Sequence, residues 1–241
     1  MARSYSVKSQ NIWKSIEIIT VNGFNLNQSV SSNLLIKINE QFPNLKCLKF
    51  HLNLHFEENN NDIVLKSSTL RTVRTIELYR IQQQQPNIKL LPQFLPNLCT
   101  LNIDYFSLCK ITKLFSTYEY ENRFLRDQIN ELNIDFESHF YSLNDIDLLF
   151  IYFYKIKIIT FLFKFKVTIF SASSIVYEIL LQLLKTTTTT TPLAYLKIHF
   201  WLNTITDDDI DCFKNKLILY FNNDEKMFNI HYDQSSLEYW T

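Results

Sequence analysis

The sequence is almost without glycine, since a single Gly occurs among its 241 residues. Phosphate-binding loops and dinucleotide-binding turns need several glycines at fixed spacing, so both classes of site are excluded. The four cysteines are scattered, and none forms a Cys-x-x-Cys pair. We therefore expect reduced thiols in an intracellular, cytoplasmic protein.

An excess of either charge is also missing, because 24 Lys and Arg balance 24 Asp and Glu. Nucleic-acid-binding proteins normally carry a basic excess or stripe, so we expect no nucleic-acid partner. The first ten residues lack an apolar segment, and no signal peptide is expected. The most apolar run, Leu148–Phe170, is interrupted by four lysines. It offers no lysine-free stretch of the ~18 residues that span a bilayer, so no membrane association is expected.

What the chain does have is a repeated pattern of apolar residues. Hydrophobic residues make up 46% of the chain, which is enough for a sizeable core. The segments Phe42–Phe50 and Leu95–Tyr105 both place Pro-Asn before an apolar-x-x-apolar-x-apolar triplet, which is typical of a turn followed by a strand. The triplets are Trp13/Ile16/Ile18, Leu45/Leu48/Phe50, Val73/Ile76/Leu78, Leu98/Leu101/Ile103, Ile129/Leu132/Ile134, Ile156/Ile159/Phe161 and Leu193/Leu196/Ile198, followed by a partial one at Leu217/Leu219.

The triplets recur every 21 to 37 residues, with candidate helices between them. Helices are expected over Ser29–Glu40, Thr117–Asn130 and Ser171–Lys185, after Ser142, and after a capping Thr206. No helix is expected between Val73 and Leu98. One repeat cannot bury its own apolar face, whereas stacked repeats bury a continuous one. We therefore predict an α/β fold, a single solenoid over residues 1–241 with a parallel sheet, helical or irregular returns, and low-complexity loop insertions at 82–86 and 186–191.

This arrangement resembles the irregular leucine-rich-repeat proteins, including the repeat part of F-box receptors of ubiquitin ligases. The family pattern continues with Asn or Cys five residues after the middle Leu, and Asn53 and Asn222 fit it. The resemblance implies a concave strand face that binds a protein partner. It also leaves open a substrate-recognition role in a ubiquitin ligase.

The strand pattern predicts which side chains point away from the core. If Leu101 and Ile103 point inward, then Thr100, Asn102 and Asp104 point outward, because strand side chains alternate. The same register applied to the other strands gives an acidic middle and an aromatic and basic C-terminal part. The predicted partner-binding residues are Glu77, Tyr79, Asn102, Asp104, Glu131, Asn133, Asp135, Tyr195, Lys197 and His199.

Sites of chemistry are weaker candidates. His51 and His55 have a zinc-like spacing, but on a strand they lie roughly 13 Å apart. The cluster at Asp207–Asp211 lacks the glycine and glutamate of a calcium loop and is better explained as a helix cap. Carboxylate pairs at Glu131 with Asp135, or Asp104 with Asp135, would lie on an open face without the burial that separates two pKa values.

Cys99 has no histidine predictably near it, so a buried, inert thiol is expected. We therefore expect no catalytic residue, no metal and no cofactor. The favoured interpretation is a monomeric module for protein–protein interaction. A ubiquitin-ligase receptor, a diverged paralogue without specific activity, and an unrecognised enzyme remain as alternatives. The role of the C-terminal stretch from Asn222 to Thr241 is left open, as either a cap or a tail.

Overall fold

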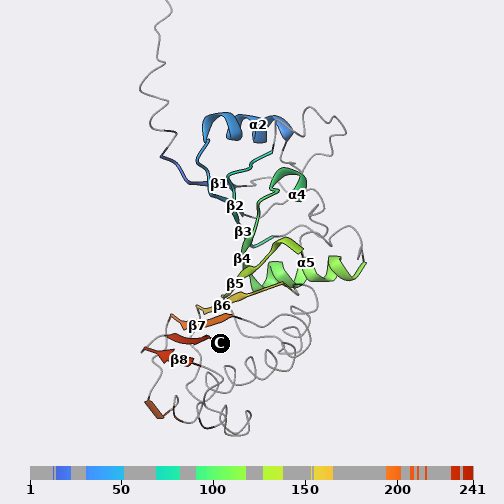
Figure 1. The fold of residues 1–241 in the computed structure, drawn as a ribbon. Helices are drawn as coiled ribbons and strands as arrows, with labels where there is room; N and C mark the ends of the chain where they lie inside the picture. The colour runs from blue at the N-terminus through green and yellow to red at the C-terminus, as the bar shows by residue number, and fades with distance from the viewer. Residues whose placement is uncertain are drawn as a thin grey trace, which may run out of the picture. The chain divides into compact units, whose positions relative to one another are not determined.

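The structure is a computed structural model. It describes residues 13, 15–22, 31–51, 69–81, 91–117, 127–137, 153, 155–164, 194–201, 207–208, 211, 215, 229–233 and 236–240. The elements are β1 (Ile18–Asn22), α2 (Ser32–Gln41), β2 (Cys47–His51), β3 (Thr75–Tyr79), α4 (Leu91–Phe94), β4 (Thr100–Asp104), α5 (Tyr105–Thr117), β5 (Glu131–Phe136), β6 (Ile158–Phe163), β7 (Tyr195–Phe200), β8 (Asn229–Tyr232) and β9 (Ser236–Trp240) (Figure 1). The predicted loop insertions at 82–86 and 186–191 lie outside the described residues.

The chain divides into two compact units. The N-terminal unit contains residues 1–102 and 106–128, and the C-terminal unit contains residues 103–105 and 129–241. In the N-terminal unit the strand order is β1-β2-β3-β4, and β1, β2 and β3 are parallel. In the C-terminal unit the order is β5-β6-β7-β9-β8, with β5, β6 and β7 parallel. The described part of the fold is therefore α/β, with open, mostly parallel sheet structure, as the sequence predicted.

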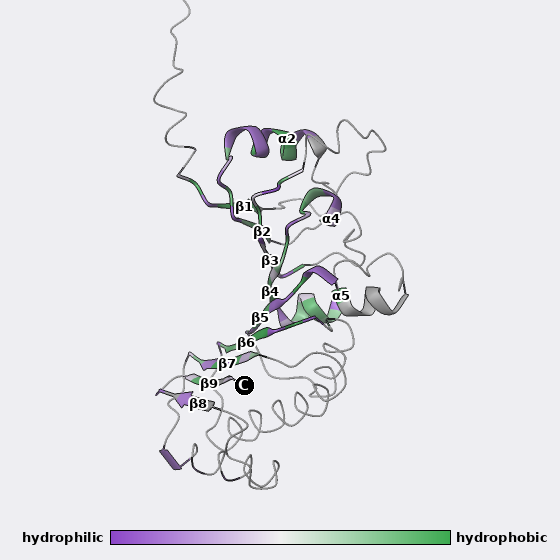
Figure 2. Cartoon of the chain, in the orientation of Figure 1, coloured by the Kyte–Doolittle hydropathy of each residue, from purple (hydrophilic) through white to green (hydrophobic). Residues whose placement is uncertain are grey.

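The core is formed by every second side chain of the strands. Strands β3 and β7 place every second residue in the interior, and their intervening residues are only partly covered. Figure 2 shows hydrophobic and hydrophilic residues within single strands. Burying an apolar side chain stabilises the fold by roughly 25 cal/mol per Å², so a strand with one apolar face has one favoured orientation. The predicted inward residues Leu48, Ile76, Leu101, Ile134 and Ile198 are all buried.

Aromatic rings line up in the core of the C-terminal unit. Phe136, Phe163 and Phe200 are partners in the parallel register of β5, β6 and β7. Their rings stack with centroids 4.8 Å and 5.1 Å apart, and Tyr105 stacks on Phe136 at 5.1 Å. All three phenylalanines are at most 1% exposed. The register of the three strands is thus reinforced by one continuous ladder of rings.

The first strand differs from the prediction by one residue. Ile18 was expected inside, but it is 54% exposed and pairs with Cys47. Ile19 pairs instead with Leu48, so Ile19 takes the inward position. Because Ile18 and Ile19 are adjacent, either of them could be the inward residue of this strand. A shift of one residue moves every side chain of a strand to the opposite face.

Helix α2 was predicted well, whereas α4 and α5 were not predicted. Helix α2 begins after Ser31, whose Oγ accepts a hydrogen bond from the Leu34 amide at 3.3 Å, and it buries Leu35 and Ile38. Helix α5 (Tyr105–Thr117) was not predicted. Of the helix expected over 117–130, the structure describes only Thr117 and residues 127–130, of which Thr117, Asp127 and Gln128 are helical. A short helix, α4, also lies in the repeat where none was expected.

Residues 142–153 are mostly outside the described part, as is the segment 171–185, so the helices expected there are not described. The segment 217–219, expected to be an eighth strand, also lies outside it.

The C-terminal stretch contains a strand pair. β9 pairs antiparallel with β7 on one side and with β8 on the other. The position beside β7 that an eighth parallel strand would take is therefore occupied by β9. The amide of Ser236 donates to Asp233 Oδ1 at 2.6 Å, which closes the turn between β8 and β9. The C-terminal stretch thus covers the last parallel strand.

Candidate outward strand face

The outward side chains of the N-terminal unit come from adjacent strands in register. Lys49 of β2 lies opposite Glu77 of β3, and His51 lies opposite Tyr79. Asn102 of β4 approaches Glu77 from the other side, where its Nδ2 donates to Glu77 Oε1 at 3.3 Å. These residues are only partly exposed, as expected for a polar face.

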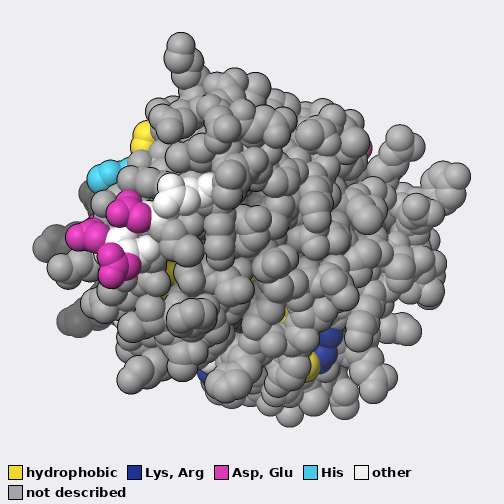
Figure 3. Space-filling view, turned by 90° about the horizontal axis from the view of Figure 1, so that it is seen from below, with side chains coloured by type: hydrophobic (Ala, Val, Ile, Leu, Met, Phe, Trp, Pro, Cys, Tyr) yellow, Lys and Arg dark blue, Asp and Glu magenta, His cyan; other side chains and the backbone are white. Residues whose placement is uncertain are grey.

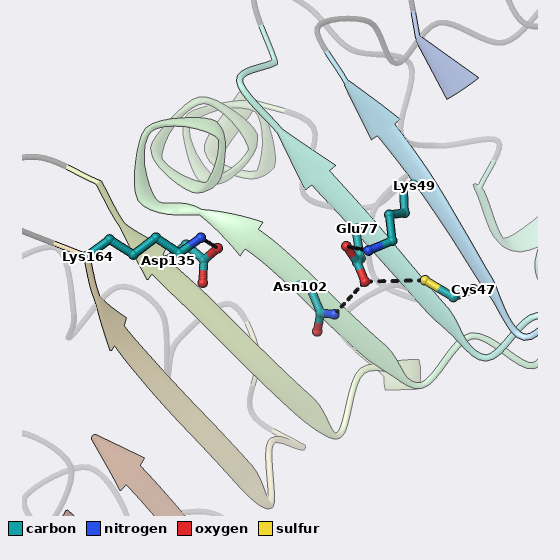
Figure 4. Close-up of polar contacts among 6 residues, drawn as sticks. All are labelled: Cys47, Lys49, Glu77, Asn102, Asp135 and Lys164. Atoms are coloured by element: carbon teal, nitrogen blue, oxygen red, sulfur yellow. Dashed lines mark hydrogen bonds and ion pairs between the residues drawn. The ribbon is translucent and has the colours of Figure 1, made fainter. Parts of the chain in front are cut away.

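Glu77 is the centre of a small polar cluster (Figure 4). Its Oε2 lies 2.6 Å from the ammonium of Lys49, and their side chains are 12% and 33% exposed. Its Oε1 accepts from the thiol of Cys47 at 3.5 Å. Burial, and next to it the charge of Glu77, raises the pKa of the Cys47 thiol to about 12. Cys47 is therefore a protonated, unreactive thiol at neutral pH.

The outward side chains of the C-terminal unit form three rows across its strands. They follow from the register of β5, β6, β7 and β9 and from the strict alternation of strand side chains. The rows are Glu131, Ile158, Tyr195, Trp240; then Asn133, Thr160, Lys197, Glu238; and then Asp135, Leu162, His199, Ser236.

Two ion pairs hold the polar rows together. Lys164 Nζ lies 2.6 Å from Asp135 Oδ2 (Figure 4), and Lys197 Nζ lies 2.6 Å from Glu238 Oε1. The hydrogen bond from Lys197 lowers the pKa of Glu238 and raises the pKa of Lys197. Burial, followed by the hydrogen bond to Glu238, raises the pKa of Tyr195. The charged groups at the centre of this face therefore neutralise one another.

Large apolar side chains are exposed at both ends of this face. Ile158 and Trp240, in the first row, are each 36% exposed, and Trp201 is 65% exposed. The amide of Tyr195 donates to Lys157 O at 3.0 Å. The amide of Trp201 donates to Phe163 O at 2.9 Å, so the same pairing recurs six residues further along both β7 and β6. The ladder thus continues to Trp201, whose side chain shares the outward parity of Tyr195.

Contacts with Lys164 agree with this placement. Its ammonium lies 5.8 Å from the ring centroid of Trp201 while it is paired with Asp135 on the same face. Among the described residues of the C-terminal unit, three large hydrophobic side chains are exposed: Ile158, Trp201 and Trp240. All three therefore belong to one surface, which we call the outward face of the C-terminal unit.

The carboxylates of the predicted acidic middle are less exposed to solvent than expected. Asp104 and Asp135 are only 5% and 7% exposed, so the expectation that both are solvated is wrong. Glu77 is ion-paired with Lys49 of β2, and Asp135 is ion-paired with Lys164, the residue after the end of β6. The carboxylate of Glu131 accepts from Asn133 Nδ2 at 3.2 Å. Alternation predicted the side on which these groups lie, but their depth depends on long side chains from adjacent strands.

The predicted carboxylate pairs are also organised differently. Glu131 contacts Asn133 within its own strand, whereas Asp135 contacts Lys164 of the next. The other predicted partner-binding residues, Tyr195, Lys197 and His199, lie together along β7 on the outward face of the C-terminal unit.

The alternative metal sites receive no support from the described residues. His51 ends β2, and His55 lies outside the described part of the chain. Asp207, Asp208 and Asp211 are exposed and helical. Figure 3 shows acidic side chains gathered on one side of the molecule. Among the residues that the structure describes, no group of three or more His, Cys, Asp or Glu is placed to hold a metal ion. No helix within the same residues is long and apolar enough to cross a membrane.

Sequence reasoning missed three residues of the face, among them Trp201, which is its most exposed large apolar residue. Trp201 lies two residues beyond His199, so continuing the alternation of β7 by one step identifies it. Trp240 and Glu238 belong to β9, in a stretch that carries no repeat triplet. Cys99, expected to be buried, is partly exposed.

The fold and this face define a class of protein: an open, mostly parallel α/β sheet structure with a polar and aromatic outward strand face. Comparison with protein-family models gives no match, and comparison with curated proteins gives none either.

Proposed function

We propose that the chain is a leucine-rich-repeat-like solenoid that binds a protein partner on its outward strand face, without catalysis. The observation that carries the proposal is the grouping of Ile158, Trp201 and Trp240 on the outward face of the C-terminal unit. Tryptophan and tyrosine are enriched among the residues that dominate binding energy in protein interfaces. Scattered exposed apolar residues need no explanation, but these three all lie on one face, at its two ends, where a single partner could contact them together.

The polar residues of the face suit the same role. Lys197 and Glu238 form a pair whose side chains are 35% and 24% exposed, so the pair is already partly removed from water. A partner that covers it does not have to supply a compensating charge. Parallel strands paired in chain order in each unit support the repeat part of the proposal.

The test is affinity purification with three baits followed by quantitative mass spectrometry. The baits are the unmodified chain, a Trp201→Ala/Trp240→Ala variant and a Phe106→Ala variant. Phe106 is the matched control, because it is 60% exposed but lies on α5. Alanine replacement of an interface tryptophan typically costs about 2 kcal/mol or more, which is roughly a 30-fold loss of affinity.

We expect at least one protein to be captured by the unmodified chain and by Phe106→Ala, and to be depleted with the double tryptophan variant. Circular dichroism must show that the double variant keeps its fold. Identical sets of captured proteins for all three baits would refute the proposal. Charge reversal of Glu77, Asp104, Glu131 and Asp135 is a poorer test, since Asp104 and Asp135 are buried and their replacement would also destabilise the fold.

A further inference from the structure

The two apolar ends of the outward face of the C-terminal unit set the length of what it binds. Tyr195, in the row of Ile158 and Trp240, and Trp201 are six residues apart along the β7 ladder. At about 3.3 Å per strand residue, the two ends are separated by about 20 Å. A partner that contacts both must extend over about this distance.

The polar centre of the face determines the kind of backbone that fits. Between the apolar ends lie the Lys197–Glu238 and Lys164–Asp135 ion pairs, whose charged atoms are already engaged with each other. An extended peptide would bring backbone N–H and C=O groups that need hydrogen-bond partners when buried. An α-helix satisfies these groups internally and needs only side-chain contacts. A helix of about 13 residues spans 20 Å at 1.5 Å per residue.

The charge of the face favours basic residues on such a helix. On β5, β6, β7 and β9, together with Lys164, the outward side chains contribute three carboxylates, Glu131, Asp135 and Glu238, against two ammonium groups, Lys164 and Lys197. The two ion pairs therefore leave one negative charge in excess on these strands. Charge complementarity across an interface directs partner choice. An acidic helix would add like charges to this surface.

We propose that the partner presents an amphipathic α-helix of at least about 13 residues, with apolar side chains near both ends of one face and Lys or Arg beside them. This inference rests on the proposed function, because it names the partner of the same surface. The helix lies along the strands, with its apolar ends against Ile158 and Trp240 at one end and Trp201 at the other.

The experiment selects peptides on the whole chain from two displayed libraries. One library consists of 15-residue peptides constrained as helices, and the other has the same randomised composition interrupted by prolines. Binders from each are then measured against the unmodified chain, Trp201→Ala, Trp240→Ala and Phe106→Ala.

We expect enrichment from the helical library, with apolar residues near both ends and with Lys and Arg outnumbering Asp and Glu. Affinity should fall about tenfold or more for each tryptophan variant and stay within twofold for Phe106→Ala. Three results overturn the inference: enrichment only of proline-interrupted or acidic peptides, binders insensitive to the tryptophan variants, or no enrichment from the helical library.

The two proposals fail separately. If the cellular partner is lost with the double tryptophan variant but only extended peptides are selected, the helix is wrong and the recognition face stands. If capture from cells does not depend on the tryptophans, the proposed function itself is wrong, whatever the libraries yield.

Discussion

Replacing Phe163 with alanine removes the middle ring of the aromatic ladder in the C-terminal unit. This ring stacks on Phe136 at 4.8 Å and on Phe200 at 5.1 Å, and its side chain is fully buried. Truncation of a buried phenylalanine costs about 3–5 kcal/mol, through lost burial and the cavity left behind. Two stacking contacts, each worth roughly 0.5–1.5 kcal/mol beyond burial, are lost as well. We therefore expect the free energy of unfolding to fall by about 4 kcal/mol or more.

Phe163→Leu separates the two contributions. Leucine retains much of the buried apolar volume but cannot stack on either neighbouring ring. The loss should then be about 1–2 kcal/mol, which is the size of the stacking contribution plus a small packing defect. An equal loss for leucine and alanine would show that cavity volume is not the dominant cause.

The assay is urea unfolding followed by tryptophan fluorescence in a Trp13→Phe background. The remaining tryptophans, Trp201 and Trp240, both lie in the C-terminal unit and report its unfolding. Phe106→Ala serves as the control, because Phe106 is 60% exposed and should change stability by no more than about 0.5 kcal/mol. A loss below about 1 kcal/mol for Phe163→Ala would refute the ladder as a stabilising element.

Three further predictions concern single side chains. The pKa of Cys47 is raised to about 12 by burial, so its contribution to stability is complete below pH 9 and is lost as pH rises toward 12; the alkaline loss should shrink in Cys47→Ala and not in Cys99→Ala, measured by urea unfolding across this range. The pKa of Glu238 is lowered by its hydrogen bond, so its contribution is present above pH 4.5 and is lost as pH falls through the lowered pKa; Glu238→Gln should therefore show a smaller acid-induced loss of stability than the unmodified chain. Ser31→Ala removes the cap of α2 and should cost about 1 kcal/mol by thermal unfolding, whereas Ser31→Asp should retain most of it.

The strand layout was largely predictable because burial and alternation are local in sequence. Leu48, Ile76 and Ile134 each lie two residues from a second apolar residue, and all three are buried as expected. The exception is the first strand, where Ile18 and Ile19 compete for the inward position. There the choice is made by the partner strand, since Ile19 lies opposite Leu48. No pattern within five residues contains that information.

The unpredicted helix α5 and the unpredicted strand pair at the C-terminus have different causes. Helix α5 follows β4 directly, and its buried residues Tyr105, Leu108 and Ile111 recur every third position. This helical spacing is present in the sequence, but it begins directly after the strand, whereas the predicted helix began at Thr117. The β8–β9 pair depends on a turn at Asp233, where a short acidic side chain bonds to the backbone.

The depth of the candidate site could not be derived from the sequence at all. Strand alternation assigns Asp135 and Trp201 to the same face, yet one is 7% exposed and the other 65%. The difference comes partly from Lys164, which follows β6 and whose side chain reaches to Asp135 and pairs with it. The same lysine offsets the charge of Asp135, so the negative charge of the face is only the small excess of its carboxylates over its ammonium groups. Asp135 thus stabilises the face, and the proposed contacts with a partner fall mainly to the exposed apolar residues beside it.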